Sequence, residues 1–75
     1  MPAKRYEFPV VIERDENGML IASAVGLNGC HTQAKTLPTL LKRIKEAISL
    51  CLEVEKDFRP SEFIGIQKIE VSSAR

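Results

Sequence analysis

The sequence predicts a small α+β domain in which one helix packs on one face of a mostly antiparallel sheet. The chain has 75 residues, which is enough for one domain spanning residues 1–75. Its first half carries three short segments of strand-forming residues, separated by turns that contain glycine. Its second half carries a long apolar stripe at helical spacing and then a further strand-like segment. The expected element order is therefore β-β-β-α-β.

The first two strands are expected to form a hairpin. Residues 6–13 are rich in aromatic and β-branched side chains that alternate between two faces. Pro9 lacks a backbone donor, so it places this strand at a sheet edge or lies near the start of the strand or at a bulge. The pair Asn17-Gly18 tolerates positive φ and favours a tight turn. The second strand then covers residues 19–24.

A third strand over residues 30–34 closes a β-meander and leads into the helix. Thr36 is the expected N-cap, and Pro38 suits the first turn because its missing N–H needs no partner there. Apolar residues then recur every three or four positions and predict a helix from residue 37 to about residue 54. Leu50 lies off this stripe, and a second subunit is one candidate for covering it.

The final strand is expected over residues 63–71, after Arg59-Pro60-Ser61 ends the helix. A chain this short buries only about 60% of the surface that its unfolded form exposes. Stability then benefits from self-association, which removes more apolar surface from water. We therefore expect a homo-oligomer, either a dimer or a higher assembly.

The composition is that of a soluble globular protein, with 44% hydrophobic and 28% charged residues. The apolar runs fall far short of the roughly 20 residues that cross a bilayer, so we expect no membrane association. Without a signal-peptide pattern, and with Cys30 and Cys51 as a reduced thiol pair, a cytoplasmic location is expected. The formal charge of +1 gives no global field to attract nucleic acid.

No residues are expected to act as catalysts, cofactor ligands or metal ligands, so the chain is not expected to be an enzyme. Cys30 and His31 are neighbours in a strand, and their side chains point to opposite faces. A four-ligand metal set is also missing. The carboxylates of Glu13, Asp15 and Glu16 fall at a hairpin tip, where a solvated turn is the usual role. A nuclease built on them would lose its RNA cleavage in Glu13→Gln.

A small nucleic-acid-binding module is an alternative reading. Its candidate residues are the cations at the start and on the outer face of the helix, namely Lys35, Lys42, Arg43 and Lys45. Aromatic side chains, which single-strand readers place among their basic residues, are absent from this group. Charge reversal at Lys42 and Arg43 would abolish binding under this reading.

A series of short features runs from residue 6 to residue 48. In order, they are the strand 8–13, the acidic turn 15–18, the small Ala22, the loop residues Leu27, Gly29 and Cys30, the pair Thr32-Gln33, the helix start Thr36-Leu37, and the run 45–48. In this order the features resemble the HicB antitoxin family. The resemblance covers more than half of the chain.

This resemblance implies a partial ribonuclease-H-like sheet and helix without the catalytic carboxylates. It implies a non-enzymatic antitoxin that neutralises a small HicA-type toxin, which cleaves mRNA, by covering the toxin's active site. Many family members also carry a C-terminal DNA-binding domain that is missing after Arg75, so no autonomous DNA binding is expected. An orphan protein without a toxin remains a further alternative.

The expected partner contacts lie in two segments of the chain. One is the charged turn, with Asp15, Glu16 and Asn17, and the other is the loop region, with Leu27, Asn28, Gly29 and His31. The acidic residues Glu53, Glu55 and Asp57, together with the off-stripe Leu50, make a second surface that suits a basic partner.

Overall fold

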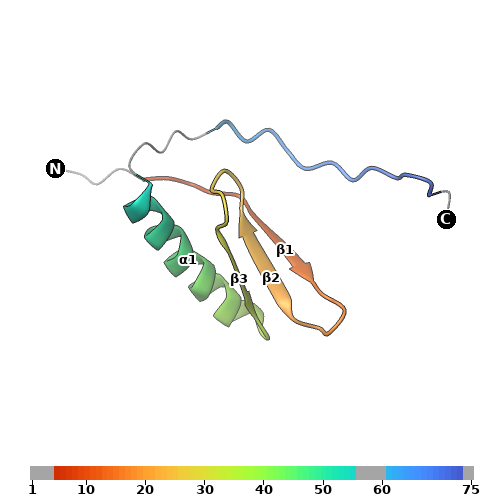
Figure 1. Cartoon of the computed structure of the whole chain (residues 1–75), viewed down its shortest axis with the longest axis horizontal. Coiled ribbons are helices and arrows are strands. Elements are labelled where there is room, and N and C mark those ends of the chain that lie inside the picture. Colours follow the sequence, from red (N-terminus) through yellow and green to blue (C-terminus); the bar gives the residue numbers. More distant parts are fainter. Residues whose placement is uncertain (1–4, 56–60, 74–75) are drawn as a thin grey trace.

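A computed structural model of the chain describes residues 5–55 and 61–73 (Figure 1). It contains three strands followed by one helix: β1 is Val10–Arg14, β2 is Leu20–Ala24, β3 is His31–Ala34 and α1 is Leu37–Val54. The predicted α+β class is confirmed. The bounds of β2, β3 and α1 agree with expectation to within one residue.

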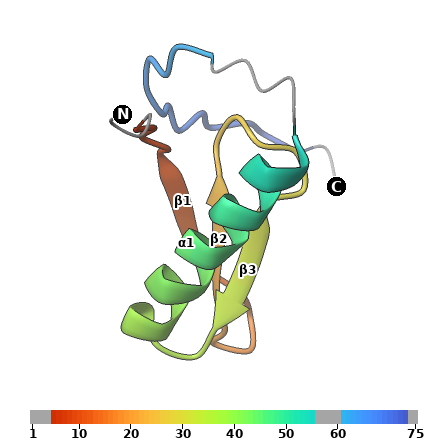
Figure 2. The same ribbon diagram turned by 90° about the vertical axis from the view of Figure 1, so that its left-hand side faces the viewer.

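The three strands form an antiparallel meander in the order β1-β2-β3. Ile12 pairs with Ala22, and Ala22 pairs with Thr32, which fixes the register of the sheet. Because side chains alternate along a strand, the register assigns Val10, Ala22 and Ala34 to one face and Val11, Ser23 and His31 to the other. α1 covers the first face (Figure 2).

The core lies between α1 and the middle of the sheet and is small. Leu40 and Ile44 of α1 pack against Ala22, Ala24 and Ala34 of the strands. The small alanine side chains let the helix approach the sheet closely, as the sequence 22–24 predicts. α1 contacts β2 and β3, so β1 extends beyond the area that the helix covers.

β1 begins later than expected, at Val10 and not at residue 6. Pro9 still accepts a hydrogen bond through its carbonyl from Val25 N–H at 2.9 Å. It has no N–H to donate in return, so regular pairing ends there. Phe8 packs at the border of the core, and its ring lies 6.2 Å from that of Tyr6.

α1 begins at the expected place, but its first turn is stabilised differently. Thr36 has extended backbone angles, and its hydroxyl makes no cap bond to a backbone N–H. Instead, Thr36 Oγ1 donates to Thr39 Oγ1 at 3.0 Å. Pro38 lies in the first turn, as predicted. No helix in residues 5–55 or 61–73 has the length and apolar character to span a bilayer.

The strand expected over residues 63–71 is not present in the structure, which has no strand within 61–73. This segment runs past the end of the sheet and away from it (Figure 1). A strand needs a neighbouring strand to pair with, and the segment does not meet one in the single chain. The expected helix stop at Arg59-Pro60 lies outside the described residues.

Candidate functional site

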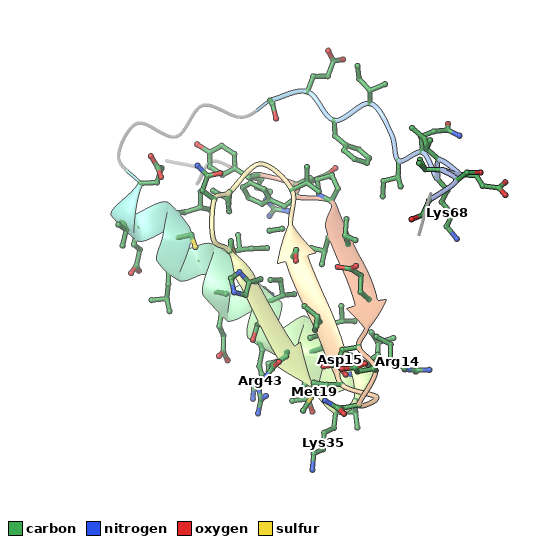
Figure 3. All side chains as sticks on the ribbon, turned by 45° about the vertical axis from the view of Figure 1, so that its right-hand side comes forward. Arg14, Asp15, Met19, Lys35, Arg43 and Lys68 are labelled. Atoms are coloured by element: carbon green, nitrogen blue, oxygen red, sulfur yellow. The ribbon has the colours of Figure 1, made fainter. Side chains whose placement is uncertain are left out.

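The meander places the two expected contact segments at opposite ends of the sheet. Asp15 lies at the end that also holds Met19, Lys35 and Arg43 (Figure 3). The loop between β2 and β3 lies at the other end, beside the last turns of α1. The five residues of β2 span about 17 Å between these ends. The expected contact residues therefore do not form one site.

The acidic turn is held together by Asp15 itself. Its Oδ1 accepts hydrogen bonds from the backbone N–H groups of Asn17 and Met19, both at 2.9 Å. Its backbone carbonyl accepts from Gly18 N–H at 3.0 Å, and Gly18 has φ +83°, as expected for this turn. The Asp15 carboxylate thus has a structural role, whereas Glu16 and Asn17 are exposed.

The four candidate cations do not line one common groove. Lys35 and Arg43 line a groove of about 310 Å³ at the start of α1. Arg43 Nη1 donates to the Gln33 carbonyl at 2.8 Å, so this side chain already bridges α1 and β3. Lys45 lines a different groove, between α1 and β1. Lys42 is exposed, and by helical spacing it lies opposite the core residues Leu40 and Ile44.

A second groove lies where the β2–β3 loop meets the end of α1. This loop–helix groove has a volume of about 280 Å³, and its lining residues are Leu27, Asn28, Leu50, Cys51, Val54 and Glu55. Leu50 is 62% exposed and Val54 is 82% exposed. Such side chains leave apolar area in water that a partner could cover.

The loop that forms one wall is fixed by its backbone. Gly26 and Gly29 have φ +94° and +69°, which side-chain-bearing residues rarely adopt. Ala24 N–H donates to the Cys30 carbonyl at 2.9 Å, which closes the loop at its base. Leu27 is mostly buried and anchors the loop in the core, so its contribution to contacts is limited to the edge of the groove.

Glu55 lines the loop–helix groove, and Glu53 lies next to Leu50 on the surface of α1 by helical spacing. Glu53 and Glu55 are exposed at the C-terminal end of α1, and the last turn has no basic residue. The helix dipole makes this end negative, so the two carboxylates are locally unfavourable for the helix. A basic partner would offset that cost, which makes this border complementary to positive charge. Asp57 lies outside the described residues.

The sequence pointed to part of this groove. Asn28 lies in it, and Leu50 was noticed because it departs from the apolar stripe. Val54 was missed because the end of a helix gives little periodic signal. Gly29 is exposed in the same loop. His31 is exposed on the sheet face away from α1, where it pairs in register with Ser23.

The two cysteines lie at the inner side of the loop–helix groove as free thiols. Burial, together with the neighbouring Cys51 thiol, raises the pKa of Cys30 from 9.0 to about 11. A thiol of this kind stays protonated and is a poor nucleophile at neutral pH. In residues 5–55 and 61–73, no three His, Cys, Asp or Glu side chains are grouped so as to hold a metal ion.

These features define a small α+β protein whose described surface offers shallow grooves at the two ends of the sheet. No family model matches the chain. Over 67 residues it is 51% identical to a UPF0150 protein of Archaeoglobus fulgidus, covering 89% of this chain and 97% of that relative.

A UPF0150 protein of Synechocystis is 46% identical over 67 residues, with the same shares of 89% and 97%. A UPF0150 protein of Thermoplasma acidophilum is 40% identical over 47 residues, covering 63% of this chain and 68% of the relative. The chain therefore belongs to the UPF0150 family. The names of these relatives state no activity.

Proposed function

We propose that the chain is a non-enzymatic binding protein of the HicB antitoxin type, which neutralises a small HicA-type toxin by covering its mRNA-cleaving active site. The observation that carries the proposal is the loop–helix groove, with its exposed apolar side chains and acidic border. In this proposal, the meander and α1 are the partial ribonuclease-H-like core of that family.

The chemistry of the groove suits a toxin that acts on RNA. A protein that binds RNA presents cations to the phosphates, so its active-site surface is basic. Glu53 and Glu55 offer carboxylates to the same cations and would compete with the phosphates for them. Leu50 and Val54 supply the apolar centre that a stable protein contact needs.

The arrangement of the cations gives less support to the nucleic-acid alternative. Lys35 and Lys45 line different grooves, and Arg43 is engaged with the Gln33 carbonyl. A backbone-tracking site needs several free cations along one groove. Nucleic-acid binding is therefore treated as one of the outcomes that the following experiment can detect.

The test recovers the tagged full chain from its native host, before and after nuclease treatment, and identifies retained molecules by mass spectrometry. The wild type is compared with Leu50→Asp in the groove and with the control Lys42→Glu, which lies outside the groove and about 12 Å nearer the start of α1. We expect the wild type and Lys42→Glu to retain a small basic protein after nuclease treatment. Leu50→Asp should retain at least about tenfold less, because its carboxylate must be desolvated on binding.

Two results would contradict this proposal. One is recovery of RNA or DNA alone, with a yield that falls in Lys42→Glu, which would identify a nucleic-acid module. The other is recovery of the chain alone, which would identify an orphan that has no toxin.

A further inference from the structure

Residues 61–73 carry apolar side chains that the chain itself does not cover. Phe63, Ile64, Ile66, Ile69 and Val71 are between 45% and 92% exposed. They make up five of the eleven exposed large hydrophobic residues within the described part of the chain. Burial of such side chains removes apolar area from water, so a segment of this kind favours a covered state.

The surface area of the whole chain supports the same conclusion. A compact monomer of 8.4 kDa exposes about 4,600 Å², whereas this chain exposes 7093 Å². Its radius of gyration is 14.9 Å, against about 11 Å for a compact chain of this length. The surplus is about 2,500 Å² per chain, or about 5,000 Å² for two chains, which is at the upper end of the 2,000 to 5,000 Å² in total that obligate homodimers bury.

The outer edge of β1 offers a place for such a segment. β1 is the end strand of the sheet, so the backbone groups on its outer side have no neighbouring strand. Ile12, on the helix side of β1, is 43% exposed because α1 packs on β2 and β3. Between α1 and β1 runs an apolar groove of about 410 Å³, lined by Phe8, Val10 and Ile48 among others.

The opposite edge of the sheet is less open. β3 has only four residues and packs directly beside α1. The Arg43 guanidinium already donates to its Gln33 carbonyl. Charged side chains and short strands are common means of protecting an edge from added strands. The β1 edge is therefore the favoured acceptor.

The segment is directed away from its own β1. It leaves the body where Ser61 and Phe63 line a groove with Phe8, Pro9 and Gly26. From there it extends past the sheet, with Ile64, Ile66, Ile69 and Val71 all exposed (Figure 1). A chain that presents both an extended donor and an open acceptor can exchange them with a second copy in a closed two-fold arrangement.

We propose that residues 63–71 of one chain add as a strand to the outer edge of β1 of a second copy, and that the exchange is reciprocal. The added strand pairs with the free backbone groups of β1. Because side chains alternate along a strand, either Ile64 and Ile66 or Phe63, Ile69 and Val71 then cover Ile12 and the groove between α1 and β1. This interface is distinct from the loop–helix groove, so the inference goes beyond the proposed function and does not depend on it.

The test measures the mass of the full chain in solution by light scattering over a range of concentrations. The double variant Ile66→Asp/Ile69→Asp is compared with Leu50→Asp, which adds the same charge at an exposed apolar residue outside the segment. We expect twice the 8.4 kDa chain mass for the wild type and for Leu50→Asp. The two substituted positions face opposite sides of a strand, so one carboxylate lies on the groove side in either orientation. The double variant should therefore dissociate at least about a hundredfold more readily, because that carboxylate resists burial. Circular dichroism then checks that α1 is retained.

Hydrogen exchange of the wild type provides a measurement that needs no variant. The amides of residues 63–71 should exchange slowly at high concentration and lose their protection on dilution. A monomer at all concentrations would overturn the proposal, whether or not these amides are protected. So would a dimer with unprotected amides in 63–71, or one that Leu50→Asp dissociates and the double variant does not.

Discussion

At the residue scale, Asp15 illustrates how a side chain that looks available for binding is used by the fold. Its carboxylate accepts two backbone hydrogen bonds and thereby closes the hairpin between β1 and β2. An aspartate that bonds its own turn in this way mimics a backbone turn. The tight turn between β1 and β2 therefore depends on Asp15, Asn17 and Gly18 together.

Replacing Asp15 should therefore change stability. We expect Asp15→Ala to lower the free energy of unfolding by about 1 to 3 kcal/mol, because two backbone donors lose a charged acceptor. Asp15→Asn keeps one side-chain oxygen as an acceptor and should lose less. Urea unfolding of the two variants measures the difference. Equal losses in both variants, or no loss in either, would contradict a structural role for the carboxylate.

Cys30 makes stability depend on pH in the alkaline range. Its pKa is raised to about 11 in the folded chain, above the ordinary 9.0, so the unfolded chain loses this proton first. The stabilisation is fully present below about pH 9 and is lost as the pH rises toward 11. Urea unfolding at about pH 8 and about pH 10.5 measures the loss.

The variant Cys30→Ala isolates this effect from other groups that titrate at the same pH. Its free energy of unfolding should change less between the two pH values than that of the wild type. A steeper dependence in the variant would show that Cys30 does not titrate as described.

At the scale of elements, α1 carries two leucines that have very different roles. Leu40 is fully buried against the sheet, whereas Leu50 is 62% exposed beside the β2–β3 loop. The same side chain at two positions of one helix gives a matched comparison, because helix propensity changes equally at both. The difference in burial should then decide how much each substitution lowers the free energy of unfolding.

We expect Leu40→Ala to lower the free energy of unfolding by about 2 to 5 kcal/mol, because it leaves a cavity under α1. Leu50→Ala should stay within about 0.5 kcal/mol of the wild type. Thermal or urea unfolding of the two variants measures both changes. A large loss in Leu50→Ala would mean that this residue stabilises the fold and does not form a free surface.

The sequence was most informative where a pattern repeats within one element. The apolar period predicted the extent of α1, and Asn17-Gly18 predicted the first hairpin. It was less informative where the outcome depends on another element. Whether Pro9 and residues 63–71 pair as strands depends on which strand lies beside them. The local sequence pattern does not specify that neighbouring strand.

The same distinction applies to the candidate site. Asn28 and Leu50 were identified from sequence, but their position on one groove follows only from the packing of α1 against the loop. From sequence, Arg43 is a candidate free cation, but its guanidinium donates a hydrogen bond to the Gln33 carbonyl of β3. The separation of the turn from the loop follows from the meander itself, because successive connections lie at opposite ends of a sheet.

At the scale of the whole molecule, the small core and the exposed segment 61–73 together make stability depend on association. Among residues 5–55 and 61–73, seven form the buried core, and the largest of them that is fully buried is Leu40. Reciprocal exchange would add the apolar side chains of residues 63–71 to each copy. Folding and association would then be coupled.

The melting temperature of the wild type should accordingly rise with protein concentration, because association stabilises the folded state by mass action. The variant Ile66→Asp/Ile69→Asp should melt at a lower temperature that does not vary with concentration. Calorimetry over about a hundredfold range of concentration measures this. A wild-type melting temperature that does not change over this range would contradict coupled association.

The claim that the chain neutralises a toxin by covering its active site is tested most directly by mRNA cleavage. The small basic protein recovered with the chain is assayed on mRNA while the full chain is added in increasing amounts. We predict that cleavage stops at one wild-type chain per toxin and that Leu50→Asp requires at least about tenfold more. Cleavage that continues at saturating chain, or RNA cleavage by the chain alone that is lost in Glu13→Gln, would contradict this account.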